Sequence, residues 1–87
     1  MGELSKLPNI GSNIEEKLKQ VGITSYEQLK EVGSKEAWLR MRKIDEGACI
    51  NSLCALEGAI QGIRWHSLSE DIKIDLKDFY KQMTSSN

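Results

Sequence analysis

Apolar residues recur at intervals of three and four along most of this 87-residue chain. No stretch shows the convincing period-two alternation of apolar and polar residues that is typical of a half-buried β-strand. The spacing predicts helices over about residues 2–6, 12–20, 24–33, 34–43, 48–63 and from Ser69 onwards. The predicted fold class is therefore all-α, a compact bundle of five to six short helices in a single domain over residues 1–87, with residues 83–87 fraying.

Capping residues and glycines mark the ends of these predicted helices. Thr24 and Glu27 form the pattern of a capping box, in which each side chain satisfies an orphan backbone donor of the other residue. We expect Gly22 and Gly33 to end two helices, because glycine readily adopts the conformation that closes a helix. Ser34 is expected to cap the helix that runs to about Lys43. Ser69 is expected to cap the last helix, whose core stripe is predicted to comprise Ile72, Leu76, Phe79, Tyr80 and Met83.

A tight turn at residues 7–11, Leu7-Pro8-Asn9-Ile10-Gly11, is the most distinctive local feature of the sequence. Pro8 disfavours helix at the residue before it, while Asn9 and Gly11 are residue types that accept a positive φ. We call residues 7–11 the hairpin turn. Ser12 or Asn13 is expected to cap the helix that follows, whose free N-terminal amides form a candidate anion site.

The predicted helix over residues 48–63 is the longest, and it has two different faces. One face carries the apolar residues Cys49, Leu53, Leu56, Ile60 and Ile63, whereas the opposite face carries Asn51, Ala55, Gly58 and Gly62. A glycine inside a helix costs about 1 kcal/mol relative to alanine, so the two glycines suggest that something approaches this face closely. The pattern slightly favours another helix of the same chain over a second subunit. Ile74 is predicted to point away from the core as a candidate partner contact.

The formal net charge of −1 gives the whole molecule no general attraction for nucleic acid. Charge is uneven along the chain, however, because residues 34–43 hold four cations against a single carboxylate. This segment is either a solvated helix face or a local patch for an anionic partner. Its charged residues are Lys35, Glu36, Arg40, Arg42 and Lys43.

Candidate chemistry for an enzyme is sparse, and we predict no catalytic residues, metal site, cofactor or small-molecule substrate. His66 is the single histidine, and it has no attached cysteine or carboxylate motif. Cys49 and Cys54 are five residues apart, so on one helix their side chains diverge and cannot form a disulfide. No apolar run reaches membrane-spanning length and no signal peptide precedes the domain, so we expect a cytoplasmic protein without a membrane partner.

The hairpin turn and the helix over residues 48–63 resemble the C-terminal domain of the TfoX (Sxy) competence regulators. The resemblance covers roughly residues 4–80 and rests on Leu7-Pro8-Asn9-Ile10-Gly11, Val21-Gly22-Ile23, Leu29, Val32-Gly33, Glu36-Ala37, Asn51, Leu53, Ala55-Leu56-Glu57-Gly58-Ala59-Ile60, Gly62, Trp65 and Leu68. It implies a bundle related to helix–hairpin–helix and SAM-like domains. It also implies a non-enzymatic bacterial protein linked to the regulation of DNA uptake or transcription. Family members often carry an N-terminal domain, which we expect to be absent before Met1.

Two functions remain open from the sequence. The first is DNA-backbone binding that is insensitive to sequence, by Lys6, Asn9, Gly11, Ser12, Asn13, Lys17, Arg40, Arg42 and Lys43. The second is contact with another regulatory protein or a second copy of the chain, by Asn51, Ala55, Gly58, Gly62 and Ile74. The resemblance favours DNA binding, whereas the overall charge balance and the repulsion between phosphate and Glu15-Glu16 favour a protein contact.

Overall fold

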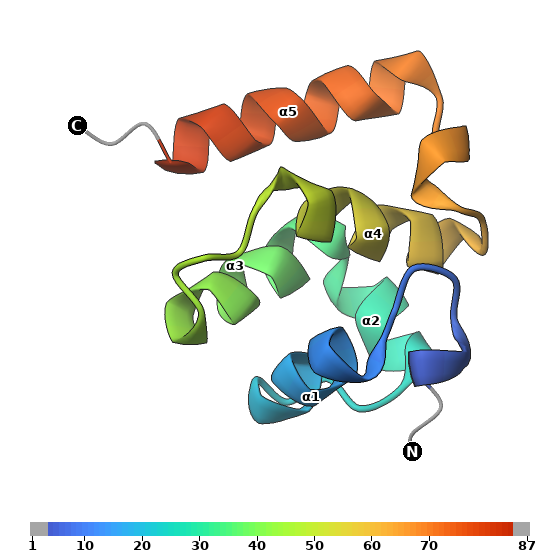
Figure 1. The fold of residues 1–87 in the computed structure, drawn as a ribbon, viewed down its shortest axis with the longest axis vertical. Coiled ribbons are helices and arrows are strands. Elements are labelled where there is room, and N and C mark those ends of the chain that lie inside the picture. Colours follow the sequence, from blue (N-terminus) through green and yellow to red (C-terminus); the bar gives the residue numbers. More distant parts are fainter. Residues whose placement is uncertain (1–3, 85–87) are drawn as a thin grey trace.

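A computed structural model of the chain describes residues 4–84, apart from the side chain of Ser5. Within this range the fold is all-helical, as predicted, and contains no strand (Figure 1). The elements in chain order are the 3-10 helix η1 (Leu4–Lys6), α1 (Ser12–Gln20), α2 (Tyr26–Val32), α3 (Ser34–Ile44), α4 (Ile50–Gln61), the 3-10 helix η2 (Trp65–Ser67) and α5 (Glu70–Thr84). The predicted residues 2 and 3 of the first helix lie outside the described range.

α4 is the central helix of the bundle. It packs against α3 on one side and α5 on the other, and Figure 1 shows α5 running across the top of the molecule. Leu53 and Leu56 are fully buried because they face these neighbours. α4 begins two residues later than its predicted start at residue 48, with Cys49 as the N-cap, and it ends where Gly62 adopts a left-handed conformation at φ 77°. Of the predicted apolar face, Leu53 and Leu56 thus lie in the core, whereas Cys49, Ile60 and Ile63 are only partly buried.

The caps of α2 and α3 differ from their predicted residues. Ser25, rather than Thr24, accepts the hydrogen bond from the Gln28 backbone N–H at 3.1 Å. The Gln28 side chain accepts from the Thr24 N–H at 2.7 Å, so the predicted pairing of Thr24 with Glu27 is replaced by bonds of Gln28 to both Thr24 and Ser25. Ser34 is the first residue of α3 instead of its cap, and its hydroxyl donates to Glu57 on α4 at 2.7 Å.

Trp38 on α3 contacts both α5 and the start of α4. Its side chain is fully buried, and its ring meets those of Phe79 and Tyr80 edge-on at centroid distances of 6.2 and 5.6 Å. The indole Nε1–H donates to the backbone carbonyl of Cys49 at 3.1 Å, which satisfies the polar end of the ring. Trp38 therefore links α3 both to α5 and to the residue that begins α4.

α5 carries the apolar stripe expected from its spacing. Leu76 is buried, and Phe79, Tyr80 and Met83 pack partly buried against the same core. The Ser69 hydroxyl accepts from the Ile72 N–H at 3.3 Å, which confirms the predicted cap. The helix continues through Thr84, so residues 83 and 84 are helical although we expected fraying from residue 83; residues 85–87 lie outside the description. No helix within residues 4–84 is both long and apolar enough to cross a bilayer.

Candidate functional site

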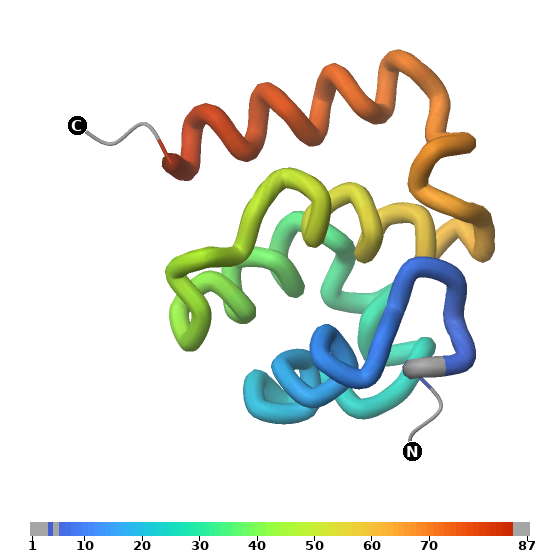
Figure 2. The backbone as a smooth tube through the Cα atoms, viewed as in Figure 1, coloured from blue at the N-terminus to red at the C-terminus, as the bar shows by residue number. Residues whose placement is uncertain are grey.

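The side chain of Asn9 holds the hairpin turn against the C-terminal end of α4. Asn9 has a positive φ of 70°, as its residue type suggested, and its amide nitrogen donates to the Ile63 carbonyl at 2.9 Å. Its amide oxygen accepts from the Trp65 backbone N–H at 3.2 Å. Figure 2 shows the turn beside the segment that connects α4 to η2. Asn9 therefore uses both ends of its side chain within the fold, instead of presenting them to DNA.

Gly58 lies on the α4 surface that this turn covers. A Cβ atom at residue 58 would stand 2.5 Å from the Asn9 amide nitrogen and 2.8 Å from the Ile63 carbonyl oxygen. The close approach suggested by this glycine is therefore made within the same chain, by the hairpin turn and the segment after α4, and not by another helix as we expected. Ala55 is also buried, whereas Asn51 and Gly62 remain exposed. Ile74, the large apolar residue among the predicted partner contacts, has 52% of its surface exposed.

The N-terminus of α1 differs from its predicted capping. Gly11 is the N-cap residue, with an ordinary extended backbone (φ −96°), and this cap makes no side-chain hydrogen bond. The prediction that Ser12 or Asn13 caps the helix is therefore wrong, and both side chains are exposed. Glu15, which we expected to oppose an anion, is buried, with only 4% of its surface exposed.

A cleft of about 340 Å³ opens beside the hairpin turn. The rings of Trp65 and His66 stack there with centroids 4.0 Å apart, and Arg64 stands exposed next to them. None of the residues that line the cleft is acidic; they are Asn9, Ile14, Asn51, Ser52, Ala55, Arg64, Trp65 and His66. Sequence reasoning missed Arg64 and Trp65, because only the long-range contacts of Asn9 bring them beside the turn.

The cations predicted to bind DNA are scattered, and most have partners in the chain. Lys17 pairs with Asp45, and this hydrogen bond, followed by that from the Gly47 N–H, lowers the pKa of the Asp45 carboxyl. Asp45 thus contributes stability that is present above its unfolded pKa and is lost as the pH falls through the lower folded pKa. Arg40 pairs with Glu36 at 3.1 Å. Lys6 is exposed near the hairpin turn.

Arg42 fastens α3 to the C-terminal end of α5. Its guanidinium donates to the Met83 carbonyl at 2.6 Å and lies 5.6 Å from the centre of the Trp38 ring. A cation suits this position because the last carbonyls of a helix lack partners and carry partial negative charge. Figures 1 and 2 place this end of α5 far from the hairpin turn, at the opposite end of α4. The structure therefore separates Arg42 from the hairpin turn.

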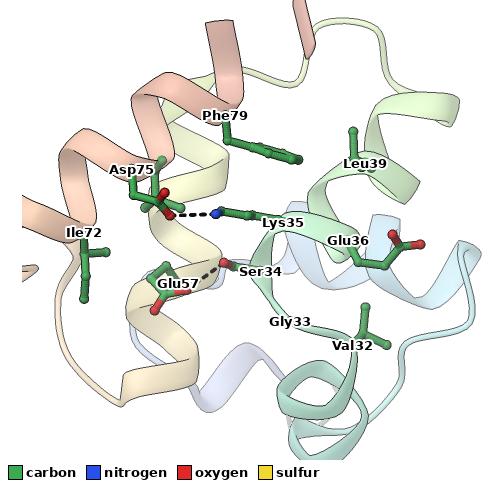
Figure 3. Close-up of a pocket in the computed structure, with 11 residues that line it drawn as sticks. Val32, Gly33, Ser34, Lys35, Glu36, Leu39, Glu57, Ile72, Asp75 and Phe79 are labelled. Atoms are coloured by element: carbon green, nitrogen blue, oxygen red, sulfur yellow. Dashed lines mark hydrogen bonds and ion pairs between the residues drawn. The ribbon is translucent and has the colours of Figure 1, made fainter. Parts of the chain in front are cut away.

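A groove of about 530 Å³ lies between α3 and α5, and we call it the α3 groove. Its apolar lining comes mainly from Val32, Leu39, Ile72 and Phe79 (Figure 3). Across the groove, Lys35 on α3 forms an ion pair with Asp75 on α5 at 2.6 Å. The Ser34 hydroxyl also donates a hydrogen bond to Glu57 on α4 at the groove. The lysine ammonium also stands 5.5 Å from the Phe79 ring. The charged groups at the groove are thus largely matched within the chain.

A second hollow of about 350 Å³ continues along the outer face of α3. Leu39 and Glu36 line both hollows, so the two are neighbours on the same helix. The second hollow, which we call the basic pocket, is otherwise lined by Arg40, Arg42 and Lys43. The outer face of α3 therefore offers an apolar region and a cationic region side by side.

The two cysteines are free thiols in different surroundings. Hydrogen bonds, chiefly from the Ser52 N–H, lower the pKa of the half-buried Cys49 thiol, whereas burial raises the pKa of Cys54. Within residues 4–84 no group of three or more histidine, cysteine or carboxylate side chains is arranged to hold a metal ion.

Comparison with known proteins identifies the family of the chain. The family model described as TfoX C-terminal domain matches residues 1–80, and the chain therefore belongs to this family. Protein Sxy of Escherichia coli (strain K12) is 33% identical over 81 residues, which are 93% of this chain but only 39% of that protein.

Solved structures share the same fold. The triclinic crystal form of an uncharacterised protein from Listeria monocytogenes is 52% identical, with a TM-score of 0.91, and the match covers 92% of this chain and 91% of that one. A tetragonal form of a Listeria monocytogenes protein of unknown function has the same identity and TM-score, and the match covers 93% and 99% of the two chains.

Proposed function

We propose that this chain is a non-enzymatic, cytoplasmic regulatory domain that binds a partner protein through the α3 groove. The observation that carries the proposal is the set of half-buried apolar side chains open to this groove, above all Leu39 and Phe79. Apolar surface of this kind is characteristic of protein contacts. Membership of the TfoX C-terminal domain family supports a task in the regulation of competence or transcription.

The arrangement of charge also favours a protein over DNA as the partner of this surface. Binding to the phosphate backbone depends on cations that are free to neutralise phosphates. Arg42 is held by the Met83 carbonyl, and Lys35 by Asp75. A duplex, moreover, has no apolar side chains to place against Leu39 and Phe79, whereas a protein has.

Photo-crosslinking in the cells that produce the protein tests the proposal. We expect a photoreactive amino acid at position 39 to give a discrete adduct with another protein, because Leu39 lines both hollows. The same amino acid at the exposed Lys77, on the other flank of α5, is the control and should not give that adduct. The absence of an adduct, identical adducts at both positions, or an adduct with nucleic acid would contradict the proposal.

DNA binding at the hairpin turn is a second candidate function. The observation that favours it is the acid-free cleft with the exposed Arg64, next to the uncapped α1 N-terminus and near Lys6. Two phosphate contacts would weaken affinity about tenfold between 50 and 200 mM salt. In an anisotropy titration with random-sequence duplex, Arg64→Ala should reduce affinity and Arg40→Ala should leave it unchanged. Undetectable binding at low salt would remove this candidate.

A further inference from the structure

The two hollows on the outer face of α3 differ in chemistry, and together they define the kind of partner that would fit. We propose that the α3 groove and the basic pocket accept an acidic amphipathic helix of a partner protein, with its apolar side chains in the groove and its carboxylates against the pocket. This inference rests on the proposed function, since it specifies the partner of the same surface.

The apolar part of the surface suits the side chains of a helix. Leu39, Ile72 and Phe79 line the groove, and each is partly buried because its other side packs against the core. These side chains therefore form a well-packed apolar surface. The adjacent carboxylates need no external cation: Asp75 pairs with Lys35, and Glu57 accepts hydrogen bonds from Ser34 and from Gln61 at 2.7 Å. A helix laid in such a groove contributes apolar anchors at three- and four-residue spacing.

The cationic part of the surface lies directly beside this floor. Lys43 is exposed and forms no ion pair within residues 4–84. Arg40 pairs only with Glu36, on the solvent side of the same helix, and an exposed pair of this type contributes at most about 1 kcal/mol, so it can exchange partners. With Arg42 held by the Met83 carbonyl, the basic pocket offers Arg40 and Lys43 to a ligand against the single carboxylate of Glu36. This excess complements an acidic ligand.

The size and composition of the surface favour a helix over DNA. Lys35 and Lys43 are eight residues apart on α3, which corresponds to about 12 Å at a rise of 1.5 Å per residue. A partner helix of two to three turns spans this length. A duplex would offer phosphates to the basic pocket but nothing apolar to Leu39 and Phe79.

Two synthetic peptides provide the test. The first is a 16-residue helix-forming peptide with leucines along one face and glutamates on its flanks; the matched control peptide has lysine in place of every glutamate. We expect the acidic peptide to bind, with affinity that falls between 20 and 200 mM salt, and to shift the backbone amide signals of Leu39 and Lys43 in NMR spectra. The lysine peptide should bind at least about tenfold more weakly, because like charges would meet at the basic pocket.

Charge-reversal variants test whether the acidic peptide binds at the basic pocket. The Arg40→Glu/Lys43→Glu double variant should bind the acidic peptide about tenfold more weakly or worse, while Lys77→Glu should bind as the unaltered chain does. All three replaced side chains are solvent-accessible, so the variants should fold, which circular dichroism checks. Equal affinity for both peptides, amide shifts confined to other elements, or an equal loss in Lys77→Glu would overturn the inference. So would displacement of the peptide by random-sequence duplex at equal concentration.

The peptide test is distinct from the crosslinking test of the proposed function. An adduct at position 39 that forms equally well in the Arg40→Glu/Lys43→Glu background would leave the protein-binding function standing and exclude an acidic partner. Loss of the adduct in that background, with retention in Lys77→Glu, would support both proposals.

Discussion

Replacing Trp38 with alanine is expected to lower the free energy of unfolding by about 3–5 kcal/mol. The side chain is fully buried, and its removal leaves a cavity between α3, α4 and α5 and exposes the edges of Phe79 and Tyr80 to that cavity. It also removes the hydrogen-bond donor of the Cys49 carbonyl. For a domain of this length the total stability is of the order of 4–13 kcal/mol, so the variant loses a large share of it. Urea denaturation followed by circular dichroism measures the change.

Trp38→Phe is the matched control for this prediction. It keeps a ring in the core but removes the indole N–H and part of the volume, so we expect a smaller loss of about 1–2 kcal/mol. A Trp38→Ala variant that loses less stability than Trp38→Phe would show that this residue does not link the three helices.

Replacing Gly58 with alanine is expected to destabilise the domain by about 2 kcal/mol, although alanine favours helix by about 1 kcal/mol over glycine. The new methyl group would stand 2.5 Å from the Asn9 amide nitrogen, 2.8 Å from the Ile63 carbonyl and 3.1 Å from the Trp65 Cα. The Asn9 side chain can move, but the other two atoms belong to the backbone of the segment after α4, so this segment must shift away from the helix. Thermal and urea denaturation measure the loss.

Gly47→Ala serves as the control for the glycine substitution. Gly47 is exposed, and the nearest atom to a new Cβ is a flexible carboxylate oxygen at 3.3 Å, so the stability change of Gly47→Ala should stay within about 0.5 kcal/mol.

Asn9→Gly tests the coupling between Asn9 and Gly58, because glycine keeps the positive φ at residue 9 but removes the side-chain amide. The loss in Asn9→Gly/Gly58→Ala should be smaller than the sum of the two single losses. Additive losses would mean that Asn9 and Gly58 do not interact.

Several features of the fold could be read from local sequence patterns. The bounds of α1 agree with the prediction of residues 12–20, since an apolar face and a closing glycine act within one segment. The Ser69 cap was predictable for the same reason. The caps at Thr24 and Ser34 were wrong because several adjacent polar residues can serve, and contacts outside the helix decide between them. Ser34, for example, is directed to Glu57 on α4 instead.

The candidate sites were less predictable, because they depend on which segments meet. Arg40, Arg42 and Lys43 form a basic cluster along the sequence, but α3 packs so that Arg42 turns to the end of α5. Arg64 lies beside the hairpin turn in the structure, but it is more than 50 positions from the turn in the sequence and belongs to no local motif. The α3 groove brings together α3 and α5, whose helical patterns reveal only which side of each helix is apolar.

The sequence by itself determined the all-α class, the approximate helix positions, the turn at Asn9 and the close approach at Gly58, because periodicity, propensity and backbone conformation are local properties. Only the tertiary structure decided that the hairpin turn and the segment after α4 cover Gly58, and that Arg42 lies at the C-terminal end of α5, away from this turn. It also created the α3 groove beside the basic pocket. The angles at which helices pack depend on side chains of several segments at once, so the neighbours of a residue cannot be read from its own segment.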